Sequence, residues 1–319
     1  MKGLTVAQRI YGGFAVLLLL LLIVITLSLV RLGQIEKSTK DINERAMPVI
    51  EGSAELTQLV LKMKNVSDQI FHAQDKSQVT QGKQQFTTLN QAFKKELEHS
   101  RSMSNGGADI KHHIQQVFEL HETFSLNNND IINHRNLDFA IAARARELLD
   151  KVKTHSDEAA ILLLDLADLE QIQSDTNLLN AVSTGDRIET SLITIVDVSI
   201  KGLREENTEV LRNSFDDLKF MLSDIDSNFQ FLAGQLQSVS DATAIIEDVK
   251  RHLQSVREGV VGDNGYFALL FERMDHKQQA IAVKAKLDSR VQQELQGLDE
   301  IQQVADQYAK TIGQQVEST

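Results

Sequence analysis

The chain has 319 residues, of which 42% are apolar but only 5% aromatic, with one proline and no tryptophan. This composition is typical of long helices and predicts an all-α fold. The lack of cysteine excludes disulfides, a thiolate nucleophile and cysteine-based metal centres, and a net charge of −12 argues against nucleic acid as a partner, because such binding needs a basic face.

The first expected element is a membrane helix. Residues 10–30, IYGGFAVLLLLLLIVITLSLV, carry no charge and would span ~31 Å as a helix, about the hydrocarbon thickness of a bilayer. A cleaved signal peptide is the alternative, but the apolar stretch is too long and no A-x-A site follows it. We therefore expect an uncleaved transmembrane helix over residues 10–31. Basic residues flank it on both sides, so charge alone does not choose its orientation.

Amphipathic helices are expected after this anchor. Apolar residues recur three and four positions apart along 56–70 and again along 188–203. The clearest breaks are SNGGAD at 104–109 and GVVGDNG at 259–265. LNNND at 126–130 and SDTN at 174–177 are candidate interruptions, because Asn, Asp and Ser side chains compete for backbone hydrogen bonds.

An internal repeat organises the chain. The segment DIKHHIQQVFE, residues 109–119, matches DVKRHLQSVRE, residues 248–258, at six of eleven positions. Two shorter matches keep the same order along the chain: FTTL at 86–89 with FDDL at 215–218, and AIAARAR at 140–146 with AIAVKAK at 280–286. We interpret the chain as a duplicated unit with halves near 33–170 and 171–319.

Each half is expected to be a long helical hairpin, and two hairpins to pack as antiparallel four-helix bundles, since one hairpin cannot bury its own apolar stripe. About 70 residues from membrane to tip is on the order of 100 Å, too long for one bundle layer. Polar segments on all four legs suggest a waist between two stacked bundles: 74–83, 126–130, 204–210 and 259–265. The expected membrane-proximal bundle comprises 33–74, 137–206 and 266–319, and the distal bundle comprises 75–136 and 207–265.

The repeated histidines are the first candidate ligand-binding residues. His113 and His252 both fall on an inward stripe, and a duplicated hairpin would bring them to the same height. Such a polar pair could contact an anion, a metal ion or a proton. The alternative is two core histidines that are hydrogen-bonded to the backbone or to a neighbouring acid.

Basic residues form the second group of candidates. Arg144 and Lys284 are each embedded among alanines, which leaves room for an anion pocket that would hold a carboxylate. The alternative is solvated basic residues whose stems cover the core. Arg187 lies among Thr190, Ser191 and Thr194, a set that suits a small polar ligand, or else it is an exposed arginine near the membrane.

Enzyme chemistry has no support in the sequence. There is no G-x-S-x-G, no Walker loop, no G-x-G-x-x-G, no H-E-x-x-H and no EF-hand loop, so no catalytic residue and no cofactor are expected. Histidines 99, 112 and 121 do not form a two-histidine-plus-carboxylate spacing, and no metal site is predicted.

Three segments share in a resemblance to a known family: the opening LTVAQRIYGGFAVLLLLLL, AMPVI at 46–50 and GDNGYFALLFERM at 262–274. Together with this layout, they resemble the sensor region of bacterial methyl-accepting chemotaxis receptors of the helical bimodular class. The resemblance implies an anchor in the inner membrane of a Gram-negative bacterium, with residues 1–9 in the cytoplasm and 32–319 in the periplasm. It also implies a homodimer, a small organic acid or amine as ligand, and a second membrane helix, a HAMP linker and a signalling hairpin, none of which these 319 residues reach.

Three functions follow as hypotheses. In the leading one, a chemoreceptor input domain binds a small solute and signals by displacing one helix. In the second, the domain belongs to a sensor kinase and recognises a periplasmic binding protein through an exposed apolar patch. In the third, the chain is a membrane-anchored structural spacer without a ligand.

Overall fold

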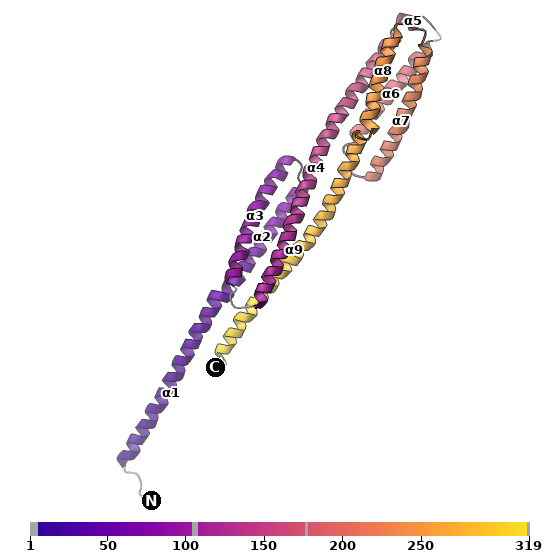
Figure 1. Cartoon of the computed structure of the whole chain (residues 1–319). Coiled ribbons are helices and arrows are strands. Elements are labelled where there is room, and N and C mark those ends of the chain that lie inside the picture. Colours follow the sequence, from indigo (N-terminus) through magenta and orange to yellow (C-terminus); the bar gives the residue numbers. More distant parts are fainter. Residues whose placement is uncertain (1–5, 104–107, 176–177, 318–319) are drawn as a thin grey trace. The chain divides into compact units, whose positions relative to one another are not determined.

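The structure is a computed structural model that describes residues 6–103, 108–175 and 178–317, and every regular element in these ranges is helical (Figure 1). The all-α prediction is confirmed. The elements in chain order are α1 (Val6–Asp41), the π-helical turn η1 (Ile42–Ala46), α2 (Met47–Phe71), α3 (Lys76–Met103), α4 (Ala108–Ala167), α5 (Glu170–Ser174), α6 (Leu179–Gly202), α7 (Thr208–Gln235), α8 (Ala242–Val261) and α9 (Tyr266–Glu317).

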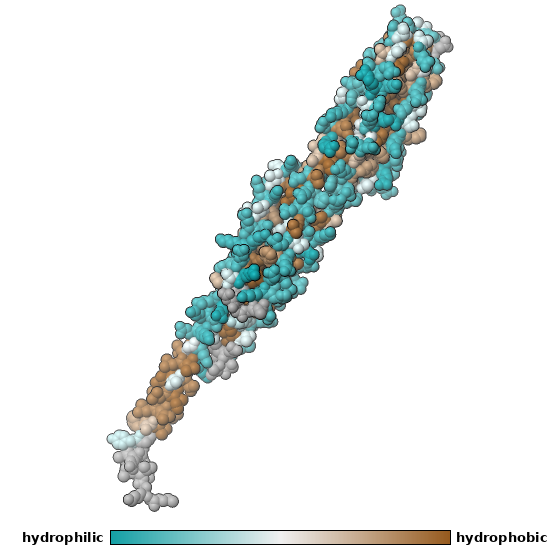
Figure 2. Space-filling model, in the orientation of Figure 1, coloured by the Kyte–Doolittle hydropathy of each residue, from teal (hydrophilic) through white to brown (hydrophobic). Residues whose placement is uncertain are grey.

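Helix α1 carries the apolar segment that was expected to cross a membrane. Among the described residues, one helix is long and apolar enough to do so, and it begins near the N-terminus. The leucines from Leu17 to Leu22 are each more than half exposed, and Figure 2 shows this stretch as a continuous apolar surface. Such a surface is compatible with a place in lipid, because apolar side chains exposed in this number are unfavourable in water.

The anchor continues as a helix into α2 through the single π-helical turn. Pro48 lies in the first turn of α2, and proline has no N–H and crowds the carbonyl four residues earlier, which is that of Glu44. A π turn accommodates this local misfit without ending the helix. Helices α1, η1 and α2 therefore follow one another without a break.

The chain forms two compact units. Unit 1 comprises Met1–His72, Thr80–Asn129 and Lys284–Thr319, and unit 2 comprises Ala73–Val79 and Asp130–Val283. Unit 1 therefore combines α2, α3, the beginning of α4 and most of α9. Unit 2 combines α6, α7 and α8 with the rest of α4 and the beginning of α9. The predicted apolar stripe at 56–70 forms part of the core of unit 1, where Leu56, Val60, Met63 and Ile70 are almost completely buried.

This division differs from the expected one, in which 75–136 packs with 207–265. The chain already reverses at residues 72–75, after the 25 residues of α2, so α3 returns beside α2 within unit 1. The expected tip at 104–109 falls mostly on residues outside the described ranges. The repeated element is consequently a short hairpin followed by a long helix, and not one long hairpin.

The repeat itself is visible in the structure. Helices α2 and α3 have 25 and 28 residues, and α6 and α7 have 24 and 28. Each second helix begins at a capping side chain: Asp75 Oδ1 accepts from the N–H of Gln78 at 2.9 Å, and Asn207 Oδ1 accepts from the N–H of Glu209 at 2.9 Å. Each unit thus contains the hairpin of one repeat, and the end of the other repeat's long helix completes it.

Helix α4 is not interrupted at LNNND, contrary to the sequence expectation. Asn128 is fully buried, and the Ser67 hydroxyl donates to its Oδ1 at 2.7 Å. The side chain that could have competed for the backbone is therefore engaged by α2. The other three polar segments each contain a helix boundary: α3 begins at Lys76, α7 begins at Thr208, and α8 ends at Val261. Of SDTN, residues 176 and 177 lie outside the described ranges.

A buried carboxylate fastens α4 to α9 in unit 2. Asp138, only 3% exposed, accepts from Arg135 Nη1 at 2.7 Å and from Arg273 Nε at 2.7 Å. Each arginine also donates to a backbone carbonyl at the end of a hairpin's first helix, Arg135 to Ala73 and Arg273 to Leu203. One carboxylate thus forms ion pairs with two arginines, and each arginine is also hydrogen-bonded to the turn of one hairpin.

Replacement of Asp138 by alanine should destabilise the protein by about 3 kcal/mol, because it leaves two partly buried guanidinium groups without their anion. The measurement is the unfolding midpoint of the full chain in detergent, followed by circular dichroism. Asp130→Ala, at an exposed position on the same helix, is the control and should change stability by less than about 0.5 kcal/mol. Equal losses in the two variants would contradict a clamping role for Asp138.

Candidate functional site

The structure does not bring the repeated histidines together. His113 lies on α4 in unit 1, and His252 lies on α8 in unit 2, so the two histidines belong to different units. They occupy matching places in the two repeats instead, each facing an acidic residue of another helix. His113 Nδ1 lies 3.4 Å from Glu300 Oε2 on α9, and His252 Nδ1 lies 3.0 Å from Glu158 Oε2 on α4.

His252 also meets a second histidine. The Nδ1 atoms of His155 and His252 are 3.0 Å apart, and His155 Nδ1 lies 3.4 Å from the same Glu158 oxygen. All three side chains belong to unit 2, and three potential ligand atoms converge there. The sequence analysis missed this cluster, although His155 and Glu158 are one helical turn apart on α4, a spacing that places them on one face.

The basic pair is separated as well. Arg144 is exposed on α4 within unit 2, whereas Lys284 is partly buried on α9 within unit 1. The Lys284 ammonium donates to both oxygens of Asp288 at 2.6 Å and lies 2.8 Å from Asp68 Oδ1. Lys64 approaches the other oxygen of Asp68 at 2.8 Å. Lys284 thus belongs to a charge network between α2 and α9.

This network shifts the pKa values of its members. Burial alone would raise the pKa of Asp68, but hydrogen bonds from Lys284 and Lys64 outweigh that effect and lower it. Burial would lower the pKa of Lys284, but hydrogen bonds to Asp288 and Asp68 raise it. Both shifts favour the charged forms, so the network is a stable ionic contact at neutral pH.

Arg187 is exposed on α6, next to the buried Ile188. The hydroxyl groups of Thr190 and Thr194 donate to carbonyls one turn earlier in their own helix, those of Asp186 and Thr190, at 2.9 Å. These threonines therefore accept rather than donate toward any ligand at Arg187.

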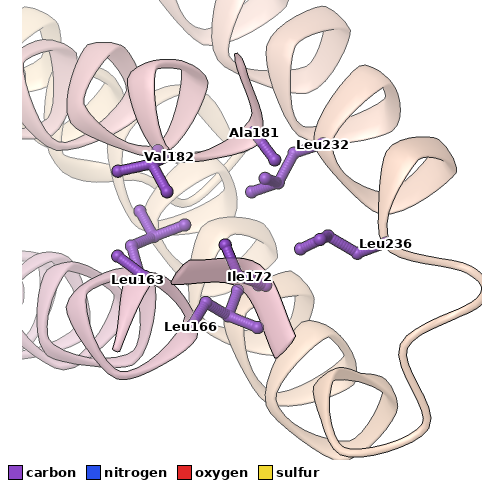
Figure 3. Close-up of a pocket in the computed structure, with 9 residues that line it drawn as sticks. Leu163, Leu166, Ile172, Ala181, Val182, Leu232 and Leu236 are labelled. Atoms are coloured by element: carbon purple, nitrogen blue, oxygen red, sulfur yellow. The ribbon is translucent and has the colours of Figure 1, made fainter. Parts of the chain in front are cut away.

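The cavity shown in Figure 3 is too small for a solute. It lies in unit 2 where α4, α5, α6 and α7 meet, and its volume of about 10 Å³ is close to that of a single water position. Apolar side chains surround it, among them Leu163, Ile172 and Leu232. We assign it to the core.

An open groove in unit 1 has the chemistry of an anion site. Its volume is about 660 Å³, and α4 and α9 form its walls. Lys286 and Arg290 contribute positive charge one turn apart on α9, and most of the remaining lining is amide or hydroxyl. The complete lining is Thr123, Asn127, Ala285, Lys286, Ser289, Arg290 and Gln293. The sequence instead predicts an anion pocket at the neighbouring Lys284, because the small alanines around that residue leave room for a ligand. Lys284 lies on another side of α9.

A polar group also lies inside the core of unit 1. His121 and Glu294 are fully buried, with Nδ1 of the imidazole 2.9 Å from Glu294 Oε1. The other ring nitrogen lies 2.7 Å from Asn90 Oδ1, and the ring stacks on Phe93 at a centroid distance of 3.8 Å. Burial raises the pKa of Glu294, although the hydrogen bond to His121 opposes this shift. Three helices, α3, α4 and α9, are joined by this contact.

Together these features define the class: an all-helical domain behind a membrane anchor, with polar groups between helices. The family described as "Four helix bundle sensory module for signal transduction" matches residues 3–181, more than half of the chain. The protein belongs to this family, the sensory modules of methyl-accepting chemotaxis proteins, and the resemblance inferred from the sequence is confirmed.

Two solved structures are similar. The TorS sensor domain, solved in a complex with TorT in the presence of TMAO, is 8% identical in sequence and has a TM-score of 0.60. The alignment covers 81% of this chain and 99% of that one. The V. parahaemolyticus histidine kinase sensor TorS sensor domain is 11% identical in sequence and has a TM-score of 0.48. The alignment covers 80% of this chain and 98% of that one. The first likeness shows a shared fold. No curated protein sequence matches this chain.

The buried histidine–glutamate contact can be tested by compensation. His121→Ala should destabilise the protein by about 3–5 kcal/mol, because it leaves the carboxyl group of Glu294 buried without its partner. The double variant His121→Leu with Glu294→Leu should recover most of that loss, since two apolar side chains leave no polar group unpaired. Unfolding midpoints provide the measurement, with the exposed His112→Ala as control. A double variant less stable than His121→Ala would refute this account.

Proposed function

We propose that the chain is the extracytoplasmic ligand-sensing domain of a transmembrane chemotaxis receptor and that it binds a small organic acid in the groove between α4 and α9. The observation that carries the proposal is the pair Lys286 and Arg290 on one face of α9, opposite Thr123 and Asn127 of α4. The chain belongs to a family of sensory modules, and the groove lies between two long helices, where a bound solute would contact both.

The side chains of the groove suit carboxylates better than amines. An ammonium and a guanidinium can both form charge-assisted hydrogen bonds to an anion, and a guanidinium can do so through two nitrogens. Arg290 Nη1 donates to Gln293 Oε1 at 2.7 Å, which orients the guanidinium from within α9. The hydroxyl and amide groups of α4 complement a second carboxylate or a hydroxyl group of the same solute. Two positive charges oppose the binding of an amine.

Contacts within unit 1 supply a route from the groove to the membrane. The Ser53 hydroxyl of α2 donates to the carbonyl of Leu298 on α9 at 2.7 Å, and this contact is buried. A ligand that shifts α9 against α4 therefore also shifts α2, and α2 continues into the anchor helix α1. Small sliding of packed helices is an established way to transmit a binding event.

The proposal extends to the cellular setting. The apolar α1 would hold the protein in the inner membrane, with residues 1–9 in the cytoplasm and 32–319 in the periplasm. A homodimer would place two anchors side by side. Both statements rest on the family and on the apolar surface of α1.

A thermal-shift screen of the full chain in detergent against small organic acids, amines and amino acids tests the binding. A mono- or dicarboxylate at one hundred times its Kd should stabilise the protein by about 2.7 kcal/mol through mass action. Lys286→Ala and Arg290→Ala should each weaken that ligand about 10- to 100-fold, as expected for the loss of one charge-assisted hydrogen bond.

Exposed Lys250→Ala serves as the control for loss of a surface charge and should leave the affinity unchanged. If instead Arg144→Ala or Arg187→Ala abolishes binding, the site lies in unit 2 and the groove is not the ligand site. If no small solute stabilises the protein, the proposal of direct solute binding fails.

A second function, recognition of a periplasmic binding protein, is favoured by the outer face of α7. Phe220 and Phe231 are 76% and 51% exposed, and eleven residues are about three helical turns, so both rings lie on one face. Exposed aromatic side chains are typical centres of protein interfaces. The similar TorS sensor domain was solved in a complex with TorT.

A photo-crosslinking amino acid at position 220 should, on this second hypothesis, capture a periplasmic solute-binding protein that mass spectrometry identifies. Phe231→Ser should then weaken the complex by about 2 kcal/mol or more, as for an aromatic residue at an interface centre, and leave the thermal stability unchanged because the ring is exposed. Ile193→Ser, at a similarly exposed site on α6, is the matched control. Capture that is unaffected by Phe231→Ser would argue against this face.

A further inference from the structure

Unit 2 contains a three-residue cluster that the proposed solute site does not use. His155 and Glu158 are one turn apart on α4, and His252 reaches them from α8. The three potential ligand atoms are two Nδ1 atoms and a single carboxylate oxygen, Oε2. Their separations are 3.0 Å between the imidazole nitrogens, and 3.0 and 3.4 Å from these to the oxygen.

These distances match the spacing of ligands around one metal ion. A triangle with such sides has a circumscribed radius of about 1.8 Å, so a point about 2.0–2.1 Å from all three atoms lies just off its plane, as Zn–N and Zn–O bonds require. Without an ion, at most one hydrogen can lie between the two facing nitrogens, so one Nδ1–H donates to the other Nδ1. A cation at the centre would satisfy all three atoms at once.

The ligand set selects the class of ion. Two imidazole nitrogens and one carboxylate oxygen suit divalent transition metals such as Zn²⁺, Ni²⁺, Co²⁺ and Cu²⁺, whereas Ca²⁺ and Mg²⁺ prefer oxygen ligands alone. The Glu158 side chain is 47% exposed, so an ion can enter from solution and keep a position for water. Neighbouring cations are neutralised locally, since Lys151 bonds to Glu147 and Arg251 to Asp248.

Helix α4 takes part in a second contact between histidines, which serves as a natural comparison. His134 on α4 and His276 on α9 also face each other through Nδ1 atoms, at 3.3 Å. At the position corresponding to Glu158, three residues after His134, the chain has Leu137. Among the described residues, only the cluster around His155 brings a carboxylate to two histidines. The Glu158 carboxylate therefore distinguishes the cluster around His155, which offers three ligands, from the contact between His134 and His276, which offers two.

We infer that His155, Glu158 and His252 form a binding site for one divalent transition-metal ion, which would fasten α4 to α8. The site lies in unit 2 and is independent of the organic-acid groove of unit 1. A bound ion would oppose any movement of α4 against α8. The chain would thereby register metal availability in addition to its solute.

The test is a titration of the full chain in detergent, stripped with a chelator, with ZnCl₂ and with NiCl₂ by calorimetry. One ion should bind per chain, and Glu158→Gln and His252→Ala should each weaken it about tenfold or more, because each removes one of three ligands. Zinc X-ray absorption should show two imidazole ligands in the wild type. Saturating Zn²⁺ should also raise the melting temperature.

Three variants separate this site from other causes. His112→Ala, at an exposed histidine, and His276→Ala, in the pair without a carboxylate, should bind Zn²⁺ as the wild type does, and so should Lys286→Ala in the solute groove. Glu158→Gln preserves shape at an exposed position, so its loss of affinity cannot come from misfolding. Equal Zn²⁺ affinity in wild type, Glu158→Gln and His252→Ala would overturn the inference, as would binding of Ca²⁺ as tight as Zn²⁺ or no binding of any transition metal.

Discussion

The carboxylate of Asp138 is the constraint on which unit 2 depends. A buried charge is unfavourable unless it is paired and hydrogen-bonded, and here Arg135 and Arg273 meet both requirements. The same two arginines donate to the carbonyls of Ala73 and Leu203, where the first helix of each hairpin ends. The contact therefore fixes the register of α4 against α9 and secures both turns. One arginine lies on the long helix α4 of the first repeat and the other on the long helix α9 of the second. Each repeat therefore contributes one arginine to this contact.

The arrangement of the repeats follows from burial. A hairpin of two short amphipathic helices exposes its apolar stripe, and it needs two further helices to cover it. Each hairpin is covered by the beginning of its own long helix and by the end of the other repeat's long helix. Neither repeat can complete a bundle alone. Helices α4 and α9 each contribute one segment to unit 1 and another to unit 2.

The polar groups between helices fall into two sets. Those that are bonded to other side chains of the protein are structural, and those that remain accessible are candidate functional residues. Lys284 is held by Asp68 and Asp288, and His121 is held by Glu294 and Asn90 inside the core. Lys286 and Arg290 instead line an open groove, as a solute site requires. The cluster around His155 gathers three potential metal ligands at a partly exposed place. Both proposed sites thus consist of side chains that are accessible from solution.

The sequence by itself determined the helical class, the apolar N-terminal helix, the duplicated halves and the buried stripe at 56–70, because composition and a period of 3.6 residues are local properties. It placed a break correctly at 259–265, where α8 ends, and its polar segment at 204–210 contains Asn207, the residue that caps the start of α7. The reversal after α2, the continuity of α4 through LNNND and the partners of His113 and His252 were decided only by tertiary structure. Asn128 stays helical because Ser67 binds it, and His252 meets His155 because a hairpin turn returns α8 to α4. Such contacts join residues far apart in the chain, and no local pattern encodes which of two equally polar segments will find a partner.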